Sequence, residues 1–125
     1  MAVAAATGLK ICIVDDDPLL LGHLVEVVNG LGHRAFPALK VNAALEIVAR
    51  SLVDAVLVDI LMPERDGLDM IMTIRGVVPR IRVVAMSGGG RIGAGAVLGM
   101  AKGLGADAVL VKPFSISELE DALKS

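Results

Sequence analysis

Short apolar runs alternate with longer amphipathic segments along nearly the whole chain. Uninterrupted apolar runs of a few residues are typical of strands buried on both faces of a parallel sheet, whereas apolar residues three and four positions apart predict helices. Their alternation predicts an α/β fold in which one doubly wound parallel sheet carries helices on both faces. The predicted strands cover residues 11–14, 34–38, 53–59, 82–86 and 108–111, and the predicted helices cover 19–31, 41–50, 67–75, 92–104 and 115–124.

Capping and turn residues place the ends of these helices. The pair Asp17-Pro18 predicts an N-cap followed by the first helical residue, and Gly32 ends that helix. Asp66 predicts the cap of the third helix, and the sequence Ser-Ile-Ser-Glu at 115–118 predicts a capping box for the last. No linker separates these elements, so we expect a single domain.

The order of the five strands follows from two arguments. Right-handed crossovers leave few arrangements of five βα units. The order 2-1-3-4-5 places strands 1 and 3 side by side at the topological switch point, with strands 4 and 5 beyond strand 3. We choose this order because it brings the acidic strand ends together, which spacing alone does not prove.

Polar residues stand at the carboxyl ends of four predicted strands. They are Asp15 and Asp16 after the first strand, Asp59 at the end of the third, Ser87 after the fourth and Lys112 after the fifth. Alone, an Asp pair before a proline predicts only a helix cap. Because the carboxyl ends of parallel strands share one edge of the sheet, the whole set predicts one shared ligand site.

Three carboxylates in that crevice predict a bound cation. Each pair within about 4 Å repels by roughly 4 kcal/mol at an effective dielectric constant of 20. Oxygen ligands with room for water and phosphate oxygens suit Mg²⁺, or Mn²⁺, better than Zn²⁺. Beside the metal, Asp59 is the candidate nucleophile for a covalent phosphoryl group, Lys112 stabilises its charge and Ser87 donates a hydrogen bond to it.

Composition and charge narrow the class of protein. With 125 residues, 55% of them apolar, the chain has the size of one domain, with residues 1–9 as a loose tail and 10–125 as the folded part. A net charge of −2 without basic clusters argues against direct nucleic-acid binding, and the longest stretch without charged residues, 92–101, is too short to span a membrane. Cys12, within an apolar run, predicts a buried and unreactive thiol, which fits a cytoplasmic protein.

One motif suggests a different ligand. Residues 88–93 fit G-x-G-x-x-G between a strand and a helix, as dinucleotide binding requires. The acid about 20 residues further on, Asp107, precedes a strand, whereas a ribose-binding acid belongs at a strand's carboxyl end. The motif G-x-x-x-x-G-K-[ST] does not occur, so neither NAD nor a P-loop nucleotide is supported.

The remaining titratable residues carry no expected chemistry. His23 and His33 have no partner at ligand spacing and are expected at the surface. The other acids that precede strands or lie on helix faces are expected to be solvated: Asp54, Glu64, Asp69 and Asp107.

Four motifs together give the chain a specific resemblance. They are the sequences at 13–18, 57–67, 84–88 and 110–114, which read IVDDDP, LVDILMP followed by DG, VAMSG and LVKPF. From residue 10 onward the chain resembles the receiver domain of two-component response regulators, which implies a flavodoxin-like fold. The resemblance also implies a stand-alone receiver, since no output domain follows in this sequence, although a receiver cut from a longer regulator would read identically.

The resemblance implies a role for each site residue. Asp59 would be the phosphoacceptor, Asp16 a direct Mg²⁺ ligand, Asp15 a ligand through water, and the backbone carbonyl of Leu61 a further ligand. Ser87 and Lys112 would contact the phosphoryl group, and the Lys112–Pro113 bond would be cis. The implied donor is a phosphohistidine on a sensor histidine kinase or a histidine phosphotransfer protein, with small acyl phosphates as alternatives, and the implied target is a protein.

The chain departs from the receiver pattern at two places. Receivers usually carry Tyr or Phe three residues before the conserved Lys, where this chain has Val109, so the usual aromatic switch is absent. Leu61 and Gly89 stand two residues past Asp59 and Ser87, where receivers tune attack by water. Output is therefore expected through the glycine-rich helix 92–104, as a low-stability element that orders on phosphorylation.

Two other functions share some of these residues. Aspartyl-phosphate hydrolases also use an Asp nucleophile, Mg²⁺ and a Lys, but carry a second acid two residues after the nucleophile, where this chain has Leu61. Poor turnover is expected from such a site. A degenerate receiver acting only as an interaction scaffold would fit Val109 but not the intact acids and Lys112.

Overall fold

A computed structural model of the chain describes residues 8–50, 53–60, 67–78, 80–88 and 94–124, with the backbone alone for 94–98. Five parallel strands form one sheet in the order β2-β1-β3-β4-β5. The predicted order is confirmed, and β1 and β3 are neighbours. The strands are β1 (Lys10–Val14), β2 (Arg34–Ala38), β3 (Ala55–Asp59), β4 (Arg82–Gly88) and β5 (Ala108–Lys112).

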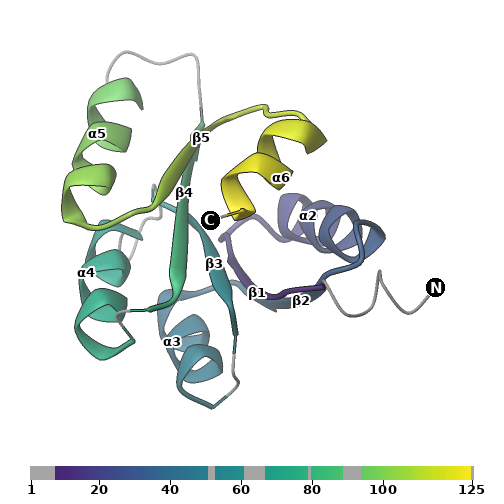
Figure 1. Cartoon of the computed structure of the whole chain (residues 1–125), viewed down its shortest axis with the longest axis horizontal. Helices are drawn as coiled ribbons and strands as arrows, with labels where there is room; N and C mark the ends of the chain where they lie inside the picture. The colour runs from purple at the N-terminus through teal and green to yellow at the C-terminus, as the bar shows by residue number, and fades with distance from the viewer. Residues whose placement is uncertain (1–7, 51–52, 61–66, 79, 89–93, 125) are drawn as a thin grey trace.

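Helices cover both faces of the sheet (Figure 1). On one face lie α2 and α6, and on the other lie α3, α4 and α5. This arrangement confirms the predicted doubly wound α/β fold. The helices are α2 (Pro18–Gly30), α3 (Val41–Arg50), α4 (Gly67–Val77), α5 (Ala94–Leu104) and α6 (Ile116–Leu123).

Caps define the starts of α2 and α6 as the sequence predicts. Asp17 Oδ1 accepts hydrogen bonds from the backbone N–H groups of the next turn, and Ser115 with Glu118 forms both bonds of a capping box. Gly32 has φ +93°, a conformation that L side chains rarely adopt. The structure has α4 ending two residues later than predicted and β4 extending two residues further, while Asp66 lies outside the described residues.

The three central strands, β1, β3 and β4, are mostly apolar because both faces of the sheet are buried there. All five residues of β3 are buried, as expected for its central position. Alternate residues pack to opposite sides: Ile13 and Leu57 contact the α2–α6 layer, and Val14 and Val58 contact the α3–α5 layer. Burial on both faces explains why uninterrupted apolar runs, with no alternation, identified the strands.

Some polar residues at the amino ends of the strands do more than contact solvent. Asp54 is exposed, but its Oδ2 accepts a hydrogen bond from Lys10 N at 2.8 Å, and Asp107 Oδ2 accepts one from Val83 N at 2.8 Å. Each acid directly precedes a strand, so it lies beside the first unpaired N–H of the neighbouring strand. Both acids are exposed, as predicted, and each also fixes a backbone N–H group of the neighbouring strand. Asp69 is exposed, and Glu64 lies outside the described residues.

The two histidines differ from each other. His23 is exposed on α2, as predicted. His33 is partly buried, and its Nδ1 accepts a hydrogen bond from Leu9 N at 3.0 Å. It holds the turn before β2 against the start of β1, so its expected surface position is only partly correct.

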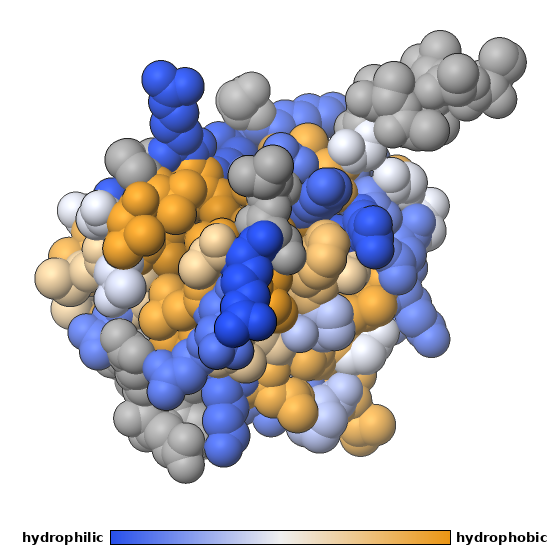
Figure 2. Space-filling model, turned by 90° about the horizontal axis from the view of Figure 1, so that it is seen from below, coloured by the Kyte–Doolittle hydropathy of each residue, from blue (hydrophilic) through white to orange (hydrophobic). Residues whose placement is uncertain are grey.

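Large apolar side chains also remain on the surface. The face in Figure 2 shows apolar groups gathered between charged side chains. The most exposed are Leu19 at 86%, Val77 at 70%, Met100 at 57% and Met72 at 54%. Single exposed apolar residues are common in soluble domains and do not by themselves indicate a binding surface. Among the described residues, no helix has both the length and the apolar character required to cross a membrane.

Candidate phosphoryl and metal site

The sheet brings the four polar strand ends to one edge. In the register of the sheet, Val14 pairs with Val58 and Asp59 pairs with Met86, so the acids after β1 and at the end of β3 are neighbours. Gly88 pairs with Lys112 on the far side of β4. Because the strands are parallel and their ends are in register, residues up to 97 positions apart come within hydrogen-bonding distance.

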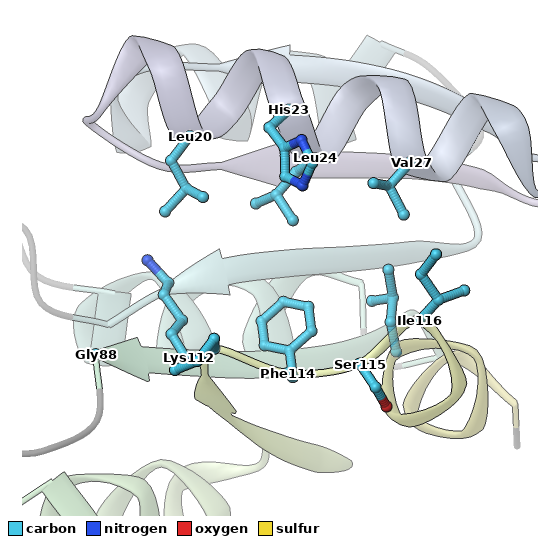
Figure 3. A pocket seen from close by; sticks show the side chains of 11 residues that line it. Leu20, His23, Leu24, Val27, Gly88, Lys112, Phe114, Ser115 and Ile116 are labelled. Carbon is cyan, nitrogen blue, oxygen red and sulfur yellow. The ribbon is translucent and has the colours of Figure 1, made fainter.

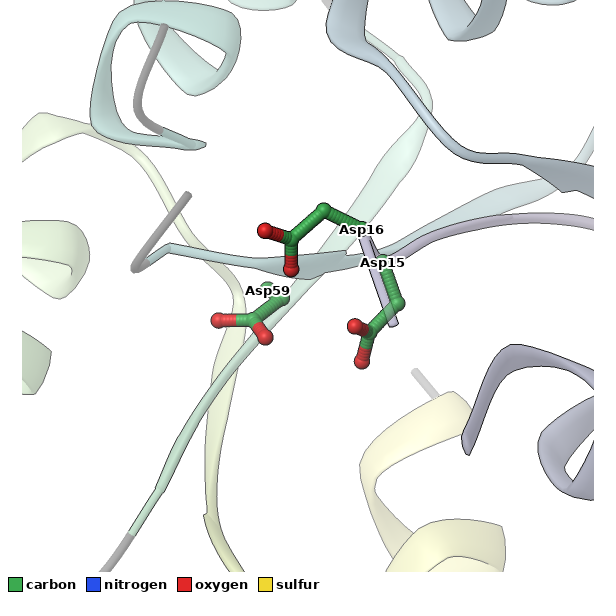
Figure 4. Close-up of side chains that lie close together, drawn as sticks. All are labelled: Asp15, Asp16 and Asp59. Carbon is green, nitrogen blue, oxygen red and sulfur yellow. The ribbon is translucent and has the colours of Figure 1, made fainter. Parts of the chain in front are cut away.

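Three carboxylates lie around one point (Figure 4). One oxygen from each of Asp15, Asp16 and Asp59 lies within 4.8 Å of the others. Asp15 and Asp59 are buried, with 1% and 6% exposure, whereas Asp16 is exposed. Asp15 is fixed from two sides: its N–H donates to Ala38 O at 3.1 Å, and its Oδ1 accepts from Asp17 N at 3.0 Å. A cation held here could keep water ligands on the side of Asp16.

Lys112 joins two of these carboxylates. Its Nζ donates to Asp15 Oδ2 at 3.0 Å and to Asp59 Oδ2 at 2.9 Å. Burial alone would lower the pKa of Lys112, but its hydrogen bonds with Asp59 and Asp15 and the attraction of their charges raise that pKa above the usual 10.5. Lys112 is therefore a cation at neutral pH.

The charges of this cluster fit a divalent metal ion. When ionised, three carboxylates beside one ammonium leave an excess of two negative charges among the described groups. Every side chain in the acidic cluster offers carboxylate oxygen, the ligand that Mg²⁺ prefers. Leu61, whose carbonyl the resemblance implies as a further ligand, lies outside the described residues.

Ser87 adds an unsatisfied hydroxyl beside this cluster. It is fully buried near the end of β4, between the strands that carry Asp59 and Lys112. Its Oγ has no hydrogen-bond partner among the described residues. Buried hydroxyls in native proteins nearly always have a partner, so an orphan at this place fits a ligand oxygen as its acceptor.

Gly67 packs tightly behind Asp59. A Cβ at this position would lie 2.6 Å from Asp59 O and 2.7 Å from Ile60 Cα, closer than van der Waals contact. The first residue of α4 therefore lies directly against the backbone that presents the acid. The sequence motif contains this glycine, but periodicity gives no signal of the close approach.

An apolar cavity of about 580 Å³ adjoins the site (Figure 3). It lies between α2 and the segment from β5 to α6, with Phe114 facing His23 and Leu24 across it. Lys112 and Gly88 line its end nearest the site. The cavity thus gives access to Lys112 along the side of α2.

The structure describes one feature that the receiver resemblance implies and one position where the chain departs from it. The Lys112–Pro113 peptide bond is cis. Val109 is 37% exposed on β5, and the structure places no aromatic ring at that position. Gly89 and most of the 88–93 motif lie outside the described residues.

The stability of the fold is expected to fall at alkaline pH for two reasons. Cys12 is buried, as predicted, and burial raises the pKa of its thiol from 9.0 to about 12. Unfolded chains release that proton first, so stability falls as pH rises from about 9 towards 12, and the raised pKa of Lys112 acts in the same direction above 10.5. Urea unfolding at several pH values measures this slope, and Cys12→Ala should flatten it between pH 9 and 10.5. An unchanged slope in that variant would contradict the assignment to Cys12.

The fold and this cluster define a class: doubly wound α/β proteins with acids and a lysine at the carboxyl edge of the sheet. Within that class, the chain matches the family model described as response regulator receiver domain over residues 11–124. The chain belongs to this family. Membership implies phosphoacceptor signalling: receiver domains accept phosphoryl groups from histidine kinases or phosphotransfer proteins and bind Mg²⁺ at an acidic pocket.

Named relatives agree with the family. The chain is 36% identical over 115 residues to sporulation initiation phosphotransferase F of Bacillus subtilis, covering 92% of this chain and 90% of that protein. It is 31% identical to the transcriptional regulatory protein PdtaR of Mycobacterium tuberculosis, covering 96% of this chain but 57% of that protein. A receiver domain protein from Clostridium thermocellum has a similar structure, with a TM-score of 0.85, 25% identity and coverage of 92% and 90%.

Proposed function

We propose that this chain is a cytoplasmic phosphoacceptor of a histidine-to-aspartate phosphorelay. In this proposal Asp59 receives the phosphoryl group in a Mg²⁺-dependent reaction, and the modified chain presents a changed surface to a protein partner. The observation that supports it most is the pair of hydrogen bonds from Lys112 Nζ to Asp15 and Asp59, next to the orphan hydroxyl of Ser87.

The transfer step follows from these groups. An Oδ of Asp59 attacks phosphorus, the P–N bond to the donor histidine breaks, and the electron pair of that bond returns to the imidazole. Lys112 exchanges part of its contact with the Asp59 carboxylate for a phosphoryl oxygen, and Ser87 Oγ donates to another. Bound Mg²⁺, held by Asp15, Asp16 and Asp59 and by the Leu61 carbonyl, would neutralise charge on the phosphoryl oxygens.

The same geometry supports slow self-dephosphorylation. Two residues after Asp59, where aspartyl-phosphate hydrolases carry a general acid, the sequence has the apolar Leu61. A water molecule attacking the aspartyl phosphate would therefore receive little help. This argues for a signalling lifetime and against efficient hydrolytic turnover.

Output is proposed to pass through the backbone that follows Ser87. Without an aromatic ring at Val109, a side-chain rotation cannot carry the signal from β5. The hydroxyl of Ser87 is the group that gains a partner when phosphoryl oxygens arrive, and Gly88 and α5 follow it along the chain. A shift in populations of this segment is the proposed signal.

Incubation with Mg²⁺ and acetyl phosphate, followed by intact-mass measurement, tests the proposed function. One phosphoryl group that adds, decays slowly and is absent from Asp59→Asn supports it. Continuous release of phosphate would instead establish a hydrolase. If no phosphoryl group adds under conditions where Mg²⁺ binds, the proposal is overturned, and a receiver that acts only as an interaction scaffold is the remaining function.

Asp16→Asn is expected to remove the stabilisation that Mg²⁺ provides. A ligand that binds only the folded state at ten times its Kd stabilises it by about 1.4 kcal/mol. Because the charge of exposed Asp16 adds to the repulsion among the three carboxylates, the metal-free variant should be at least as stable as the metal-free wild type. Urea unfolding with and without MgCl₂ measures both quantities, with exposed Asp121→Asn as the matched control. An equal Mg²⁺ effect in Asp16→Asn would contradict the ligand assignment.

A further inference from the structure

One arginine joins several segments at the sheet edge opposite the site. Arg75, in the last turn of α4, donates from Nε to Gly105 O at 2.8 Å and from Nη1 to Ile81 O at 2.7 Å. Its Nη2 forms an ion pair with Asp107. The guanidinium group thus connects α4 to the segment before β4 and to the turn between α5 and β5.

The turn that Arg75 holds is itself tied to the sheet and to α5. Asp107 Oδ2 also accepts from Val83 N at 2.8 Å, and Lys102 Nζ donates to Asp107 O at 2.9 Å. Gly105 has φ +122°, and a Cβ there would lie 2.8 Å from Arg75 Cγ. The turn is therefore built around the arginine side chain, and the carboxyl end of α5 is fixed from several directions.

The other end of α5 has a different connection. The helix begins at Ala94, six residues after Gly88, and so follows the strand that carries Ser87. Within the helix, Gly99 and Gly103 are exposed, and a Cβ at either position would meet nothing within 4 Å. Glycine in a helix interior costs about 1 kcal/mol relative to alanine, so α5 has little intrinsic stability of its own.

We infer that Arg75 is an anchor that makes α5 a lever fixed at its carboxyl end. A conformational change that begins in the backbone after Ser87 reaches the amino-terminal half of α5 first. The contacts of Arg75 keep the turn at Gly105 and Asp107 in place during this change. The anchored turn starts β5, about 13 Å along the strand direction from the site edge, so the sheet is held while the helix responds. The response of α5 rests on the proposed function, because phosphorylation starts the conformational change. The anchoring contacts of Arg75 do not depend on that function.

Hydrogen exchange followed by mass spectrometry tests the anchor, using the whole chain with Mg²⁺ in the presence and absence of beryllofluoride. In Arg75→Met, amides of residues 100–107 are expected to exchange about tenfold faster than in the wild type, even without beryllofluoride. Asp107→Asn keeps an acceptor for Val83 N but loses the ion pair, and should give a smaller change in the same peptides. Arg50→Met, at an exposed arginine in the last turn of α3, is the matched control and should change nothing.

Beryllofluoride allows the response of α5 and the anchoring by Arg75 to be tested separately. In the wild type it should alter exchange in the first half of α5 and leave 100–107 unchanged, whereas in Arg75→Met the change should extend through 107. Unaltered exchange of 100–107 in both Arg75→Met and Asp107→Asn would overturn the anchor. A wild-type response equally large at both ends of α5 would overturn the lever, and a wild type that gains no phosphoryl group from acetyl phosphate would overturn the lever together with the proposed function.

Discussion

Lys112→Met should slow phosphoryl uptake from acetyl phosphate by about 10²–10³-fold at saturating Mg²⁺. The methionine keeps an unbranched side chain, one atom shorter, but removes the positive charge that contacts Asp59 at 2.9 Å. Charge that develops on the phosphoryl oxygens during transfer then lacks one of its stabilising partners. Intact-mass measurement of the initial rate checks this, with exposed Lys124→Met as the control. Equal rates of phosphoryl uptake in the variant and the wild type would contradict the proposed role of Lys112 in the transfer.

The same substitution should also weaken the fold in the absence of metal. Asp15 and Asp59 are both buried, and Lys112 lies within hydrogen-bonding distance of each. Removing one partner from a buried ionic cluster costs about 3 kcal/mol because the remaining charges are left uncompensated. Urea unfolding should show this loss in Lys112→Met, and MgCl₂ should restore a larger share of stability than it adds to the wild type. This second readout distinguishes a lost charge from a lost packing contact.

Gly67→Ala is expected to destabilise the chain by about 3 kcal/mol and to slow phosphoryl uptake together. The added methyl group would overlap Asp59 O and Ile60 Cα, which are backbone atoms and cannot rotate away. Relief requires either α4 or the end of β3 to move, and the second movement displaces Asp59 from Lys112. Thermal and urea unfolding measure the stability, and acetyl phosphate labelling measures the uptake.

Gly22→Ala provides the matched control for that substitution. Gly22 lies in the middle of α2, and a Cβ there meets nothing within 4 Å. Alanine should therefore stabilise the helix by about 1 kcal/mol without altering phosphoryl uptake. A Gly67→Ala variant as stable as the wild type would contradict the close packing of α4 against the Asp59 backbone.

Much of the fold could be predicted because the sequence signals were local or periodic. Apolar runs marked the strands, and Asp17 and Ser115 marked helix starts through hydrogen bonds within one turn. The convergence of Asp15, Asp59 and Lys112 also followed, since parallel strands connected by helices must place their carboxyl ends at one edge. The strand order was harder to predict, because it also required the argument that the acidic strand ends should lie together.

Features that depend on tertiary contacts could not be predicted from the sequence. Asp54 and Asp107 resemble ordinary solvated acids in sequence, and only the sheet register brings them beside Lys10 N and Val83 N. The contacts of Arg75 reach 30 residues along the chain to Gly105, and no periodicity marks them. These hydrogen-bond partners depend on which loops lie side by side once the helices have packed on the sheet.

Reduction of the phosphorylated chain with borohydride tests the central claim most directly. Borohydride converts an aspartyl phosphate to homoserine, so the position of the new residue identifies the carboxylate that carried the phosphoryl group. After treatment with Mg²⁺ and acetyl phosphate, peptide mass mapping should find homoserine at position 59 and at no other acid. Homoserine at position 15 or 16, or a chain that carries phosphate but contains no homoserine, would contradict the account.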